Sequence, residues 1–527
     1  CRCVDSMHYW NLYFLLKVAL FYRGYLGFHW ALNLALGAAL AWPLTQGRWR
    51  RLRNVLAVPA ALALLYHDSF LPPPARVLSQ AQALLGFSAD YWWELLQRVW
   101  SPALAGAMVA IVFAYSLLAR RIRFATLALA GILSVPIVSH LSADPVETIA
   151  NSATATADGQ PTTPDGLLKT FYAAQSRLHL QLQRSDTAAA PFDIIVLHVC
   201  SLSWDDMAFV GMRQHPLLQR FDVVFSNFNS AASYSGPASL RLLHGTCGQQ
   251  AHTQIYDSEE PSCYVFPSLE KLGYQTQALL NHDGVYEGFG ATLEEKGGLA
   301  GKFLPNQNAA VHMQNFDGSP IYNDYALLSQ WWQKRLSQGG APVALYYNTI
   351  SLHDGNRVPG MTSRSSLDTY KPRLMQLLTD LDRFISELEA AQRPVVLVLV
   401  PEHGAALRGN KMQISGMREI PSPNITLVPT AVKLIGLKNS AAGDAGTSNA
   451  PLVVDTAMSY LDLFTLLSDW LADSPYAAQP LKSLAERVAK LPGTRFVSEN
   501  ADVITMRNEA DQYLLKSGND PWIRYTP

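Results

Sequence analysis

Hydrophobic residues are distributed unevenly along the chain, and this unevenness predicts two parts of different kinds. Before about residue 141 they form five long apolar runs, at 11–24, 26–45, 54–71, 102–119 and 123–141. A helix needs about 20 apolar residues to cross a bilayer. The stretch 11–45 is too long for one span, so we interpret it as a hairpin of two. The pattern therefore predicts an α-helical transmembrane domain of five spans over residues 1–141.

Two basic clusters orient these predicted spans. They lie at residues 47–53 and 120–123, and arginine-rich loops of this kind face the cytoplasm. Five spans place both clusters on the cytoplasmic side of the membrane and leave everything after residue 141 on the outer side. The segment 72–101, which contains Tyr91-Trp92-Trp93, is then predicted to be an external loop with aromatic residues at the interface. Buried helices of a soluble domain are the alternative interpretation.

The next segment, residues 142–190, differs in composition. Its first part is rich in Ala, Ser, Thr and Pro, which is typical of a flexible tether. A short helix is expected at about 166–184. Its leucines predict either a position on the membrane or packing against the domain that follows.

From residue 191 to 527, continuous apolar strands alternate with helical patterns. The clearest strands are at 193–199, 342–347 and 394–400, and the clearest helices are at 322–337, 365–391 and 456–471. Apolar strands separated by helices indicate a mostly parallel sheet that is covered on both faces. Ligands of such α/β domains gather at the carboxyl ends of the strands.

Composition adds limits to this picture. The 527 residues suffice for about three domains of ordinary size. The formal net charge of -1 argues against a dedicated nucleic-acid binder. Among the cysteines, Cys247 and Cys263 lie in a loop-like stretch outside the predicted cytoplasm, where disulfides persist. Their pairing would leave Cys200 single, although a Cys200–Cys247 pair remains possible from the sequence alone.

The stretch with the strongest chemical signal is Ser235-Gly236-Pro237, followed by a helical pattern to His244. Proline is favoured in the first turn of a helix. Ser235 is therefore expected at a helix N-terminus, where free N–H groups and the helix dipole favour an anion such as a phosphate. A serine hydroxyl becomes a good nucleophile only when a base or a metal activates it. An ordinary helix cap is the alternative.

Candidate metal ligands directly follow two of the predicted strands. Cys200 ends the first strand, and Glu402-His403 follows the strand at 394–400. Thiolate, carboxylate and imidazole are all zinc ligands, and a thiolate with an imidazole favours zinc over magnesium or calcium. With the Ser235 oxygen they predict a four-coordinate site for one Zn²⁺. The alternatives are a Cys200 that acts as a small hydrophobic residue and a solvated loop at 402–404.

Other polar residues complete the candidate site. His353 follows the strand near 343–350 and is the candidate for proton transfer. Arg418 is expected to hold phosphate oxygens, and Glu419 is expected to accept an ammonium group, with an exposed ion pair as the alternative. Asn281-His282-Asp283 closes another strand and is a weaker candidate for lining the site.

Four motifs together resemble a known family. They are Cys200-Ser201-Leu202-Ser203-Trp204, the stretch 233–238, Ser351-Leu352-His353-Asp354 and Pro401-Glu402-His403-Gly404. They are similar to those of the cellulose phosphoethanolamine transferases of bacterial cellulose secretion systems. The resemblance implies an α/β alkaline phosphatase/sulfatase-like catalytic domain with one zinc. It also implies Ser235 as the nucleophile, the metal ligands Cys200, Ser235, Glu402 and His403, active-site roles for Tyr234, His353, Arg418 and Glu419, and a Cys247–Cys263 disulfide.

Two neighbouring families differ from this chain. Lipid A phosphoethanolamine transferases carry a threonine nucleophile and an acidic residue where Cys200 stands. Sulfatases require an arginine four residues after the Cys or Ser that is modified, and here that position is Ser239. The motifs therefore favour the cellulose-modifying family.

The resemblance implies a specific activity and location. The expected reaction transfers phosphoethanolamine from phosphatidylethanolamine to glucosyl 6-hydroxyls of cellulose. The expected location is the bacterial inner membrane, with a periplasmic catalytic domain beside the cellulose synthase complex. Alternatives are transfer to lipid A or another glycan, hydrolysis of a phosphodiester, and an inert scaffold role.

Overall fold

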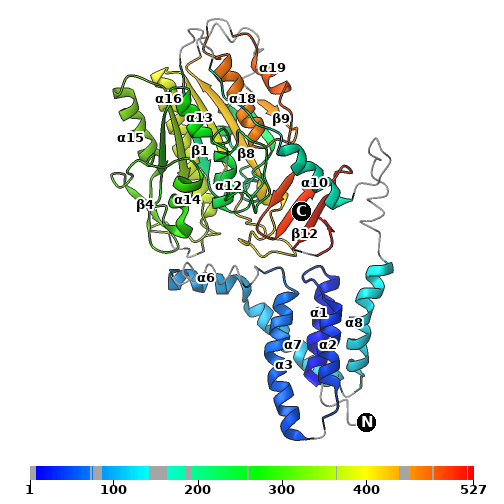
Figure 1. Cartoon of the computed structure of the whole chain (residues 1–527). Coiled ribbons are helices and arrows are strands. Elements are labelled where there is room, and N and C mark those ends of the chain that lie inside the picture. The colour runs from blue at the N-terminus through cyan, green and yellow to red at the C-terminus, as the bar shows by residue number, and fades with distance from the viewer. Residues whose placement is uncertain are drawn as a thin grey trace. The chain divides into compact units, whose positions relative to one another are not determined.

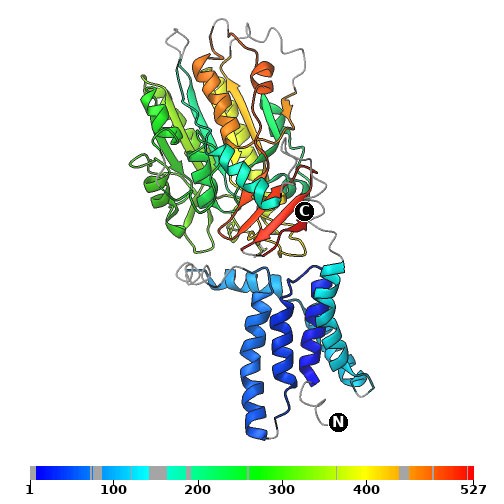
Figure 2. The same cartoon turned by 45° about the vertical axis from the view of Figure 1, so that its right-hand side comes forward.

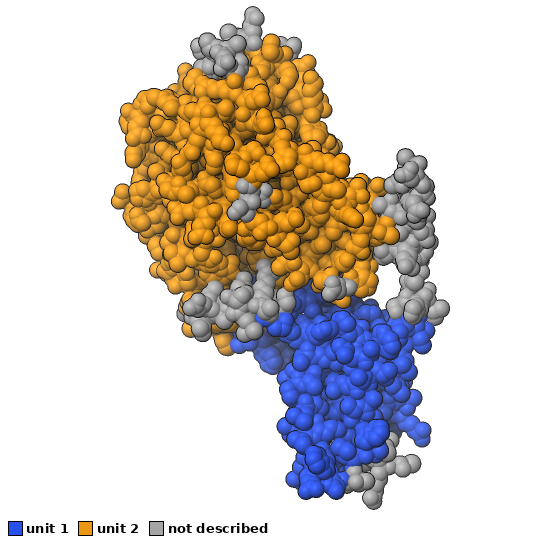
Figure 3. All heavy atoms as spheres, in the orientation of Figure 1, with its two compact units in different colours: residues 1–79, 95–161, 409–415 blue, residues 80–94, 162–408, 416–527 orange. Residues whose placement is uncertain are grey.

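The structure of the protein is a computed structural model. The described residues are 8–44, 46–71, 74, 86–119, 121–141, 163–184, 191–257, 260–361, 363, 365–437, 450–477, 480–518 and 520–527. They form two compact units, coloured separately in Figure 3. The first unit comprises residues 1–79, 95–161 and 409–415, and the second comprises residues 80–94, 162–408 and 416–527.

The first unit is helical. Its main helices coincide with the five predicted apolar runs: α1 His8–Tyr22, α2 Trp30–Ala41, α3 Gly47–His67, α7 Pro102–Leu118 and α8 Phe124–Leu141. Phe14 and Val18 of α1, Leu40 of α2 and Ile132 of α8 form its buried core. Among the helices that the structure describes, none is both long and apolar enough to cross a bilayer alone; only the bent pair Ala89–Arg98 and Pro102–Leu118 meets both requirements together. The five-span arrangement stays a prediction.

The predicted external loop 72–101 contains a helix that the sequence interpretation missed, α6 Ala89–Val99. Tyr91 and Glu94 are buried, whereas Trp92 and Trp93 are 47% and 59% exposed. Residues three or four positions apart share one face of a helix. The interpretation as a loop was wrong because the aromatic run hid this helical spacing.

The helix predicted at 166–184 is shorter than expected. The structure contains α10 Pro164–Gln175, which Thr163 caps through its side chain. Beyond α10 the chain is extended, and Leu180 N donates to Thr246 O at 2.7 Å. Leu180 and Leu182 pack against a core of the second unit. Backbone pairing with Thr246 and packing on this core therefore replace the last turns of the predicted helix. Residues 142–162 and 185–190 of the predicted tether lie outside the described residues.

The second unit is built on a seven-stranded sheet with the order β3-β6-β1-β7-β8-β2-β9. The strands are β1 Asp193–Val199, β2 Val223–Asn229, β3 Gln275–Leu280, β6 Val343–Thr349, β7 Val395–Pro401, β8 Leu427–Ile435 and β9 Leu452–Val454. Of these seven, only β8 is antiparallel to its neighbours. The prediction of a mostly parallel sheet is confirmed.

Helices cover both faces of this sheet (Figures 1 and 2). Successive side chains of a strand point to opposite faces. Ile195 and Leu197 of β1 therefore join one core, whereas Ile194 and Val196 join the other. The first core is completed by α11 Trp204–Phe209, α15 Asp324–Ser337 and α16 Tyr370–Ala391. The second is completed by α12 Ser235–Leu243, α13 Val265–Lys271, α14 Phe289–Lys296 and α18 Tyr460–Ala472. The helices predicted at 322–337, 365–391 and 456–471 are confirmed as α15, α16 and α18.

Smaller elements complete the second unit. An antiparallel sheet is formed by β10 Val497–Glu499, β11 Val503–Arg507, β12 Tyr513–Ser517 and β13 Ile523–Tyr525. A hairpin pairs β4 Val311–Gln314 with β5 Pro320–Tyr322, and two short helices are α17 Pro423–Thr426 and α19 Leu484–Ala489. These strands have only three to five residues, which is too short for a clear periodic pattern.

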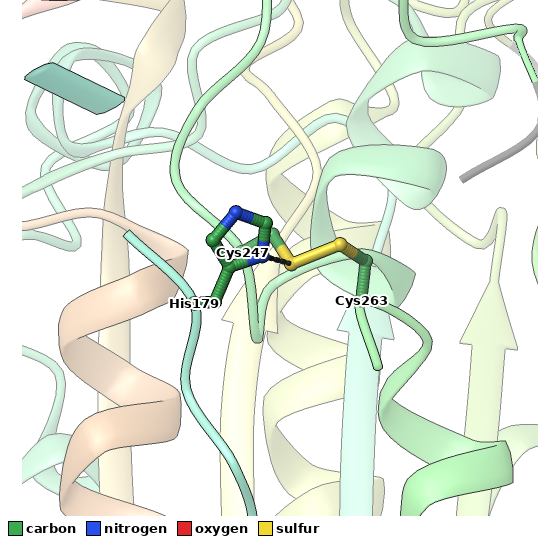
Figure 4. A group of neighbouring side chains, drawn as sticks. All are labelled: His179, Cys247 and Cys263. Atoms are coloured by element: carbon green, nitrogen blue, oxygen red, sulfur yellow. Dashed lines mark hydrogen bonds between the residues drawn. A yellow bond between two sulfur atoms is a disulfide. The ribbon is translucent and has the colours of Figure 1, made fainter. Parts of the chain in front are cut away.

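Cys247 and Cys263 form a disulfide (Figure 4). His179, in the extended segment after α10, places Nδ1 3.3 Å from Cys247 Sγ. Of the cysteines that the structure describes, Cys200 is buried and forms no disulfide. The alternative pairing of Cys200 with Cys247 is therefore excluded.

Candidate active site

The residues singled out in the sequence lie at one edge of the main sheet. Cys200 directly follows β1, Glu402 and His403 follow β7, and the loop with His353 follows β6. These three strands are parallel neighbours. Their carboxyl ends therefore meet, as the sequence pattern predicts for an α/β sheet.

Ser235 is the first residue of α12, with Tyr234 at the N-cap position. Its Oγ lies 3.4 Å from Cys200 Sγ and 3.3 Å from His403 Nε2. The sulfur and the imidazole nitrogen are 3.9 Å apart. Glu402 Oε2 lies 3.7 Å from His403 Nε2. The structure thus brings together all four residues that the sequence suggested as metal ligands.

Cys200, Glu402 and His403 are fully buried, whereas Ser235 is half-buried, and burial dominates the protonation of these three groups. Burial, with the nearby Glu402 carboxylate, raises the pKa of Cys200 to about 12. Burial also raises the pKa of Glu402. Burial and then the positive charge of Arg418 lower the pKa of His403. Each of these shifts favours a neutral group, and a bound divalent cation would reverse them for the thiol and the carboxyl.

The hydrogen bonds around these groups fit a metal ion. Glu402 Oε1 accepts a hydrogen bond from Asn348 Nδ2 at 2.5 Å, whereas Oε2 is buried with no hydrogen-bond partner among the described residues. His403 Nδ1 donates to Gly404 O at 2.9 Å, which leaves the Nε2 lone pair directed to Ser235. A buried carboxylate oxygen without a partner is costly. The set of S, N and O donors therefore fits zinc.

A buried polar layer under Glu402 was missed in the sequence. Asn348 lies on β6 and also accepts a hydrogen bond from His282, whose Nε2 is 3.1 Å from Asn348 Oδ1. Tyr346 OH contacts Asn348 Nδ2 at 3.4 Å and His198 Nδ1 at 3.0 Å. The signal in the sequence was an asparagine near the end of a mostly apolar strand. His282, which the sequence suggested as a weak candidate for lining the site, thus contacts Asn348, the residue that holds Glu402.

A second support holds the loop that follows His403. The buried carboxylate of Asp206, in α11, accepts hydrogen bonds from Ala405 N at 2.6 Å and Leu407 N at 3.0 Å. Gly404 packs so closely here that an added Cβ would lie 2.5 Å from Asp206 Oδ2. Ala406 adopts a φ of 57°, in the left-handed region. This strained turn is maintained by the surrounding contacts, as is common at functional sites.

Arg418, Glu419 and Tyr234 form the next part of the site. Arg418 Nη1 lies 3.2 Å from His403 Nδ1 and 3.3 Å from Ser201 Oγ. Its guanidinium carbon lies 5.6 Å from the centre of the Tyr234 ring. Tyr234 OH donates to Glu419 Oε1 at 2.5 Å. Glu419 is buried, which excludes the alternative of an exposed ion pair.

His353 lies in the loop after β6. Its Nδ1 donates to Asp354 O at 2.7 Å, which leaves Nε2 as a proton acceptor. Burial and then Arg418 lower the pKa of His353 to about 4, so the imidazole is neutral at neutral pH. Arg373 supports the loop by donating to Ser351 O at 2.9 Å and His353 O at 3.0 Å. The structure shows no direct hydrogen bond between His353 and Ser235.

The same loop is tied to α6, which was not predicted. Tyr91 OH donates to Asp354 Oδ2 at 3.0 Å. Glu94 accepts a hydrogen bond from Ser366 Oγ at 2.9 Å and pairs with Arg357 at 2.7 Å. The Phe316 ring lies between the Tyr91 and His353 rings, at 5.7 Å and 5.5 Å from their centres. Residues more than 250 positions apart thus fix the loop of His353.

Comparison with protein families gives a match over almost the whole chain. Residues 10–137 match the cellulose biosynthesis protein BcsG N-terminal domain, and residues 148–522 match the BcsG C-terminal domain. The chain belongs to the BcsG family. The BcsG protein of Escherichia coli (strain K12) is 36% identical over 98% of this chain and 96% of its own length. BcsG of Salmonella typhimurium is 35% identical over the same shares.

Solved structures resemble the BcsG-family chain more distantly. An alkaline phosphatase superfamily protein from Vibrio parahaemolyticus is 14% identical, covers 68% of this chain and 86% of its own, and has a TM-score of 0.48. The integral membrane lipooligosaccharide phosphoethanolamine transferase A from Neisseria meningitidis is also 14% identical. It covers 88% of this chain and 94% of its own, with a TM-score of 0.42. At these distances we draw nothing about activity from them.

Proposed function

We propose that the chain is a zinc-dependent phosphoethanolamine transferase. The proposed reaction moves phosphoethanolamine from phosphatidylethanolamine to glucosyl 6-hydroxyls of cellulose, through a phosphoethanolamine–Ser235 intermediate. The observation that carries the proposal is the position of Ser235 Oγ, at a helix N-terminus and within 3.4 Å of both Cys200 and His403. Membership of a cellulose biosynthesis family supports cellulose as the acceptor.

Cys200, Glu402 and His403 would hold the zinc together with Ser235. A bound zinc would lower the pKa of the serine hydroxyl and polarise a phosphoryl oxygen. Ser235 Oγ then attacks phosphorus. The Oγ–P bond forms, the bond from phosphorus to the glycerol oxygen breaks, and diacylglycerol leaves with a proton. The N–H groups at the start of α12 and the Arg418 guanidinium stabilise the charge on the phosphoryl oxygens.

The second half of the proposed reaction regenerates Ser235. His353 Nε2 takes the proton of a glucosyl 6-hydroxyl, which is possible because the imidazole is neutral at neutral pH. The acceptor oxygen attacks phosphorus, the Oγ–P bond breaks, and Ser235 Oγ regains a proton. Glu419, held by Tyr234, accepts the ammonium group of the transferred phosphoethanolamine.

We place the helices of the first unit in the bacterial inner membrane and the catalytic unit in the periplasm. The basic residues 47–53 and 120–123 would face the cytoplasm. This arrangement keeps the catalytic site near its lipid donor and raises the donor's effective concentration. The cellulose synthase complex is the proposed partner, because it delivers the glucan to the same side.

The test uses the full-length chain in vesicles that contain phosphatidylethanolamine. Mass spectrometry of the protein should find phosphoethanolamine on Ser235 when no glucan is present. Added cello-oligosaccharide should take up the group at its 6-hydroxyls, which phosphorus NMR detects. Ser235→Ala should abolish both signals, whereas Ser268→Ala, a serine of α13 far from the metal ligands in the chain, should keep them.

Two outcomes would contradict the proposal. Full transfer by Ser235→Ala would remove Ser235 as the nucleophile. Release of free phosphoethanolamine, with no product on cello-oligosaccharide, would indicate a phosphodiester hydrolase instead.

A further inference from the structure

A second group of metal-type ligands lies in the first unit, separate from the proposed active site. His29 is the N-cap residue of α2, His67 ends α3, and Asp68 is the residue after it. One ligand atom from each of these residues lies within 4.8 Å of the other two. We propose that His29, His67 and Asp68 form a second site for a divalent cation of the zinc class. This inference does not depend on the proposed function.

The Asp68 carboxylate is oriented by two buried residues. Lys17 of α1 donates to Oδ2 at 2.6 Å, and Asn33 of α2 donates to the same oxygen at 2.8 Å. Lys17 also donates to Asn33 Oδ1 at 2.9 Å. The side chains of Lys17 and Asp68 are 2% and 0% exposed. These contacts occupy Oδ2 and direct Oδ1 toward the imidazoles, as the partners of a metal-binding carboxylate usually do. Oδ1 also accepts a hydrogen bond from the backbone N–H of His29 at 3.3 Å.

Both imidazoles converge on this one oxygen. His29 Nδ1 lies 2.8 Å from Asp68 Oδ1, and His67 Nδ1 lies 3.5 Å from it. Lys17 already balances the charge of Asp68, and a hydrogen bond to Oδ1 is enough to explain the position of His29. It does not explain the position of His67, which makes no hydrogen bond to Asp68 within the described residues. Zinc bonds of about 2.0 Å place tetrahedral ligands roughly 3.3 Å apart, between the two measured distances.

The ligand types and their exposure fit an ion that exchanges with solvent. Two histidines and one carboxylate are zinc ligands. The side chains of His29 and His67 are 40% and 52% exposed, so an ion can enter and a fourth position stays open to water or a phosphate oxygen. A bound ion would join the start of α2 to the end of α3. No sulfur takes part, in contrast to the site that contains Cys200.

The absence of sulfur gives the test its selectivity. Full-length protein in detergent is loaded with zinc and analysed by mass spectrometry of the metal, and a parallel sample is loaded with cobalt. We expect two ions per chain. The double variant His29→Ala/His67→Ala should lose one ion and keep the thiolate-to-cobalt charge-transfer band. The variant Cys200→Ala should lose that band and keep the ion at the second site. His312→Ala, a half-buried histidine of the second unit, should change neither.

A second measurement covers the possibility that the double variant fails to fold. In the Cys200→Ala background, zinc should raise the melting temperature of the first unit, and His67→Gln should remove that rise. A wild-type content of one ion with the charge-transfer band intact would overturn the proposal. So would an unchanged metal content in His29→Ala/His67→Ala accompanied by loss of bound phospholipid, which would assign the cluster to a lipid headgroup. Loss of the Cys200 site alone would count against the proposed function and not against this second site.

Discussion

Asn348 is the residue on which the orientation of the Glu402 carboxylate depends. Its amide holds Oε1 and leaves Oε2 free to bind a cation. It is fully buried and is itself fixed by His282 and Tyr346. An asparagine at the end of an apolar strand gives no hint in the sequence of which ligand it supports.

Replacing Asn348 by leucine should weaken zinc binding by about 10- to 100-fold, because partners of a ligand orient it and their loss has this typical effect. Competition with a zinc chelator of known affinity would measure the change. The matched variant Asn227→Ala, on β2 and half-buried, should bind zinc like the wild type. Equal affinity for Asn348→Leu and wild type would show that Glu402 needs no such support.

His244, which follows α12, links stability to pH. Its Nε2 donates to Lys296 O at 2.6 Å, and burial lowers the pKa of His244 to about 4. The unfolded pKa is about 6.5, so the folded state binds fewer protons between these two values. The contribution to stability is complete above about pH 6.5 and is lost as the pH falls toward 4. For a shift of this size it amounts to about 3 kcal/mol.

We therefore expect His244→Gln to make the free energy of unfolding less dependent on pH between 6.5 and 4. Urea unfolding at several pH values would measure this slope for the wild type and the variant. The control Thr379→Ala, which changes an exposed and non-titratable residue of α16, should keep the wild-type slope. Parallel pH profiles for wild type and His244→Gln would contradict the prediction.

At the scale of elements, the buried face of α6 contacts the loop that contains His353. Tyr91 and Glu94 point to this loop, while Trp92 and Trp93 remain exposed. Under the proposed function the exposed aromatic residues would meet the membrane interface, where tryptophan is enriched. The element then fixes a catalytic loop close to the lipid donor.

Tyr91→Phe should lower kcat/KM up to about tenfold, because it removes one hydrogen bond, worth roughly 0.5–1.5 kcal/mol, to Asp354. The ring and its packing on Phe316 are retained, so zinc content should not change. Transfer rates in phosphatidylethanolamine vesicles would measure the effect, with Gln97→Ala as the control at an exposed position of the same helix. A rate equal to that of the wild type would show that Asp354 does not need Tyr91.

At the scale of the whole molecule, the covalent link between Cys247 and Cys263 closes a loop over a sequence separation of 16. His179 contacts the same disulfide from the segment after α10 (Figure 4). The link therefore restrains a part of the chain in which the described residues form turns and no helix or strand.

The double variant Cys247→Ser/Cys263→Ser should lose about 3 kcal/mol of unfolding free energy, the value expected from chain entropy for a loop of this size. Denaturant unfolding would measure it. Wild-type protein treated with reductant should behave like the variant. A variant as stable as the oxidised wild type would mean that the folded contacts alone hold this loop.

The sequence by itself determined the local features of this protein. Apolar runs and their periods located the main helices and strands. The residues after the strands identified Cys200, Glu402 and His403, and the start of a helical pattern identified Ser235. Only the tertiary structure decided what depends on contacts between distant segments. The early end of α10, the support of Glu402 by Asn348 and the convergence of His29, His67 and Asp68 are all of this kind. The physical reason is that side-chain spacing is a property of neighbours along the chain, whereas burial and hydrogen-bond partners are set by residues that folding brings together.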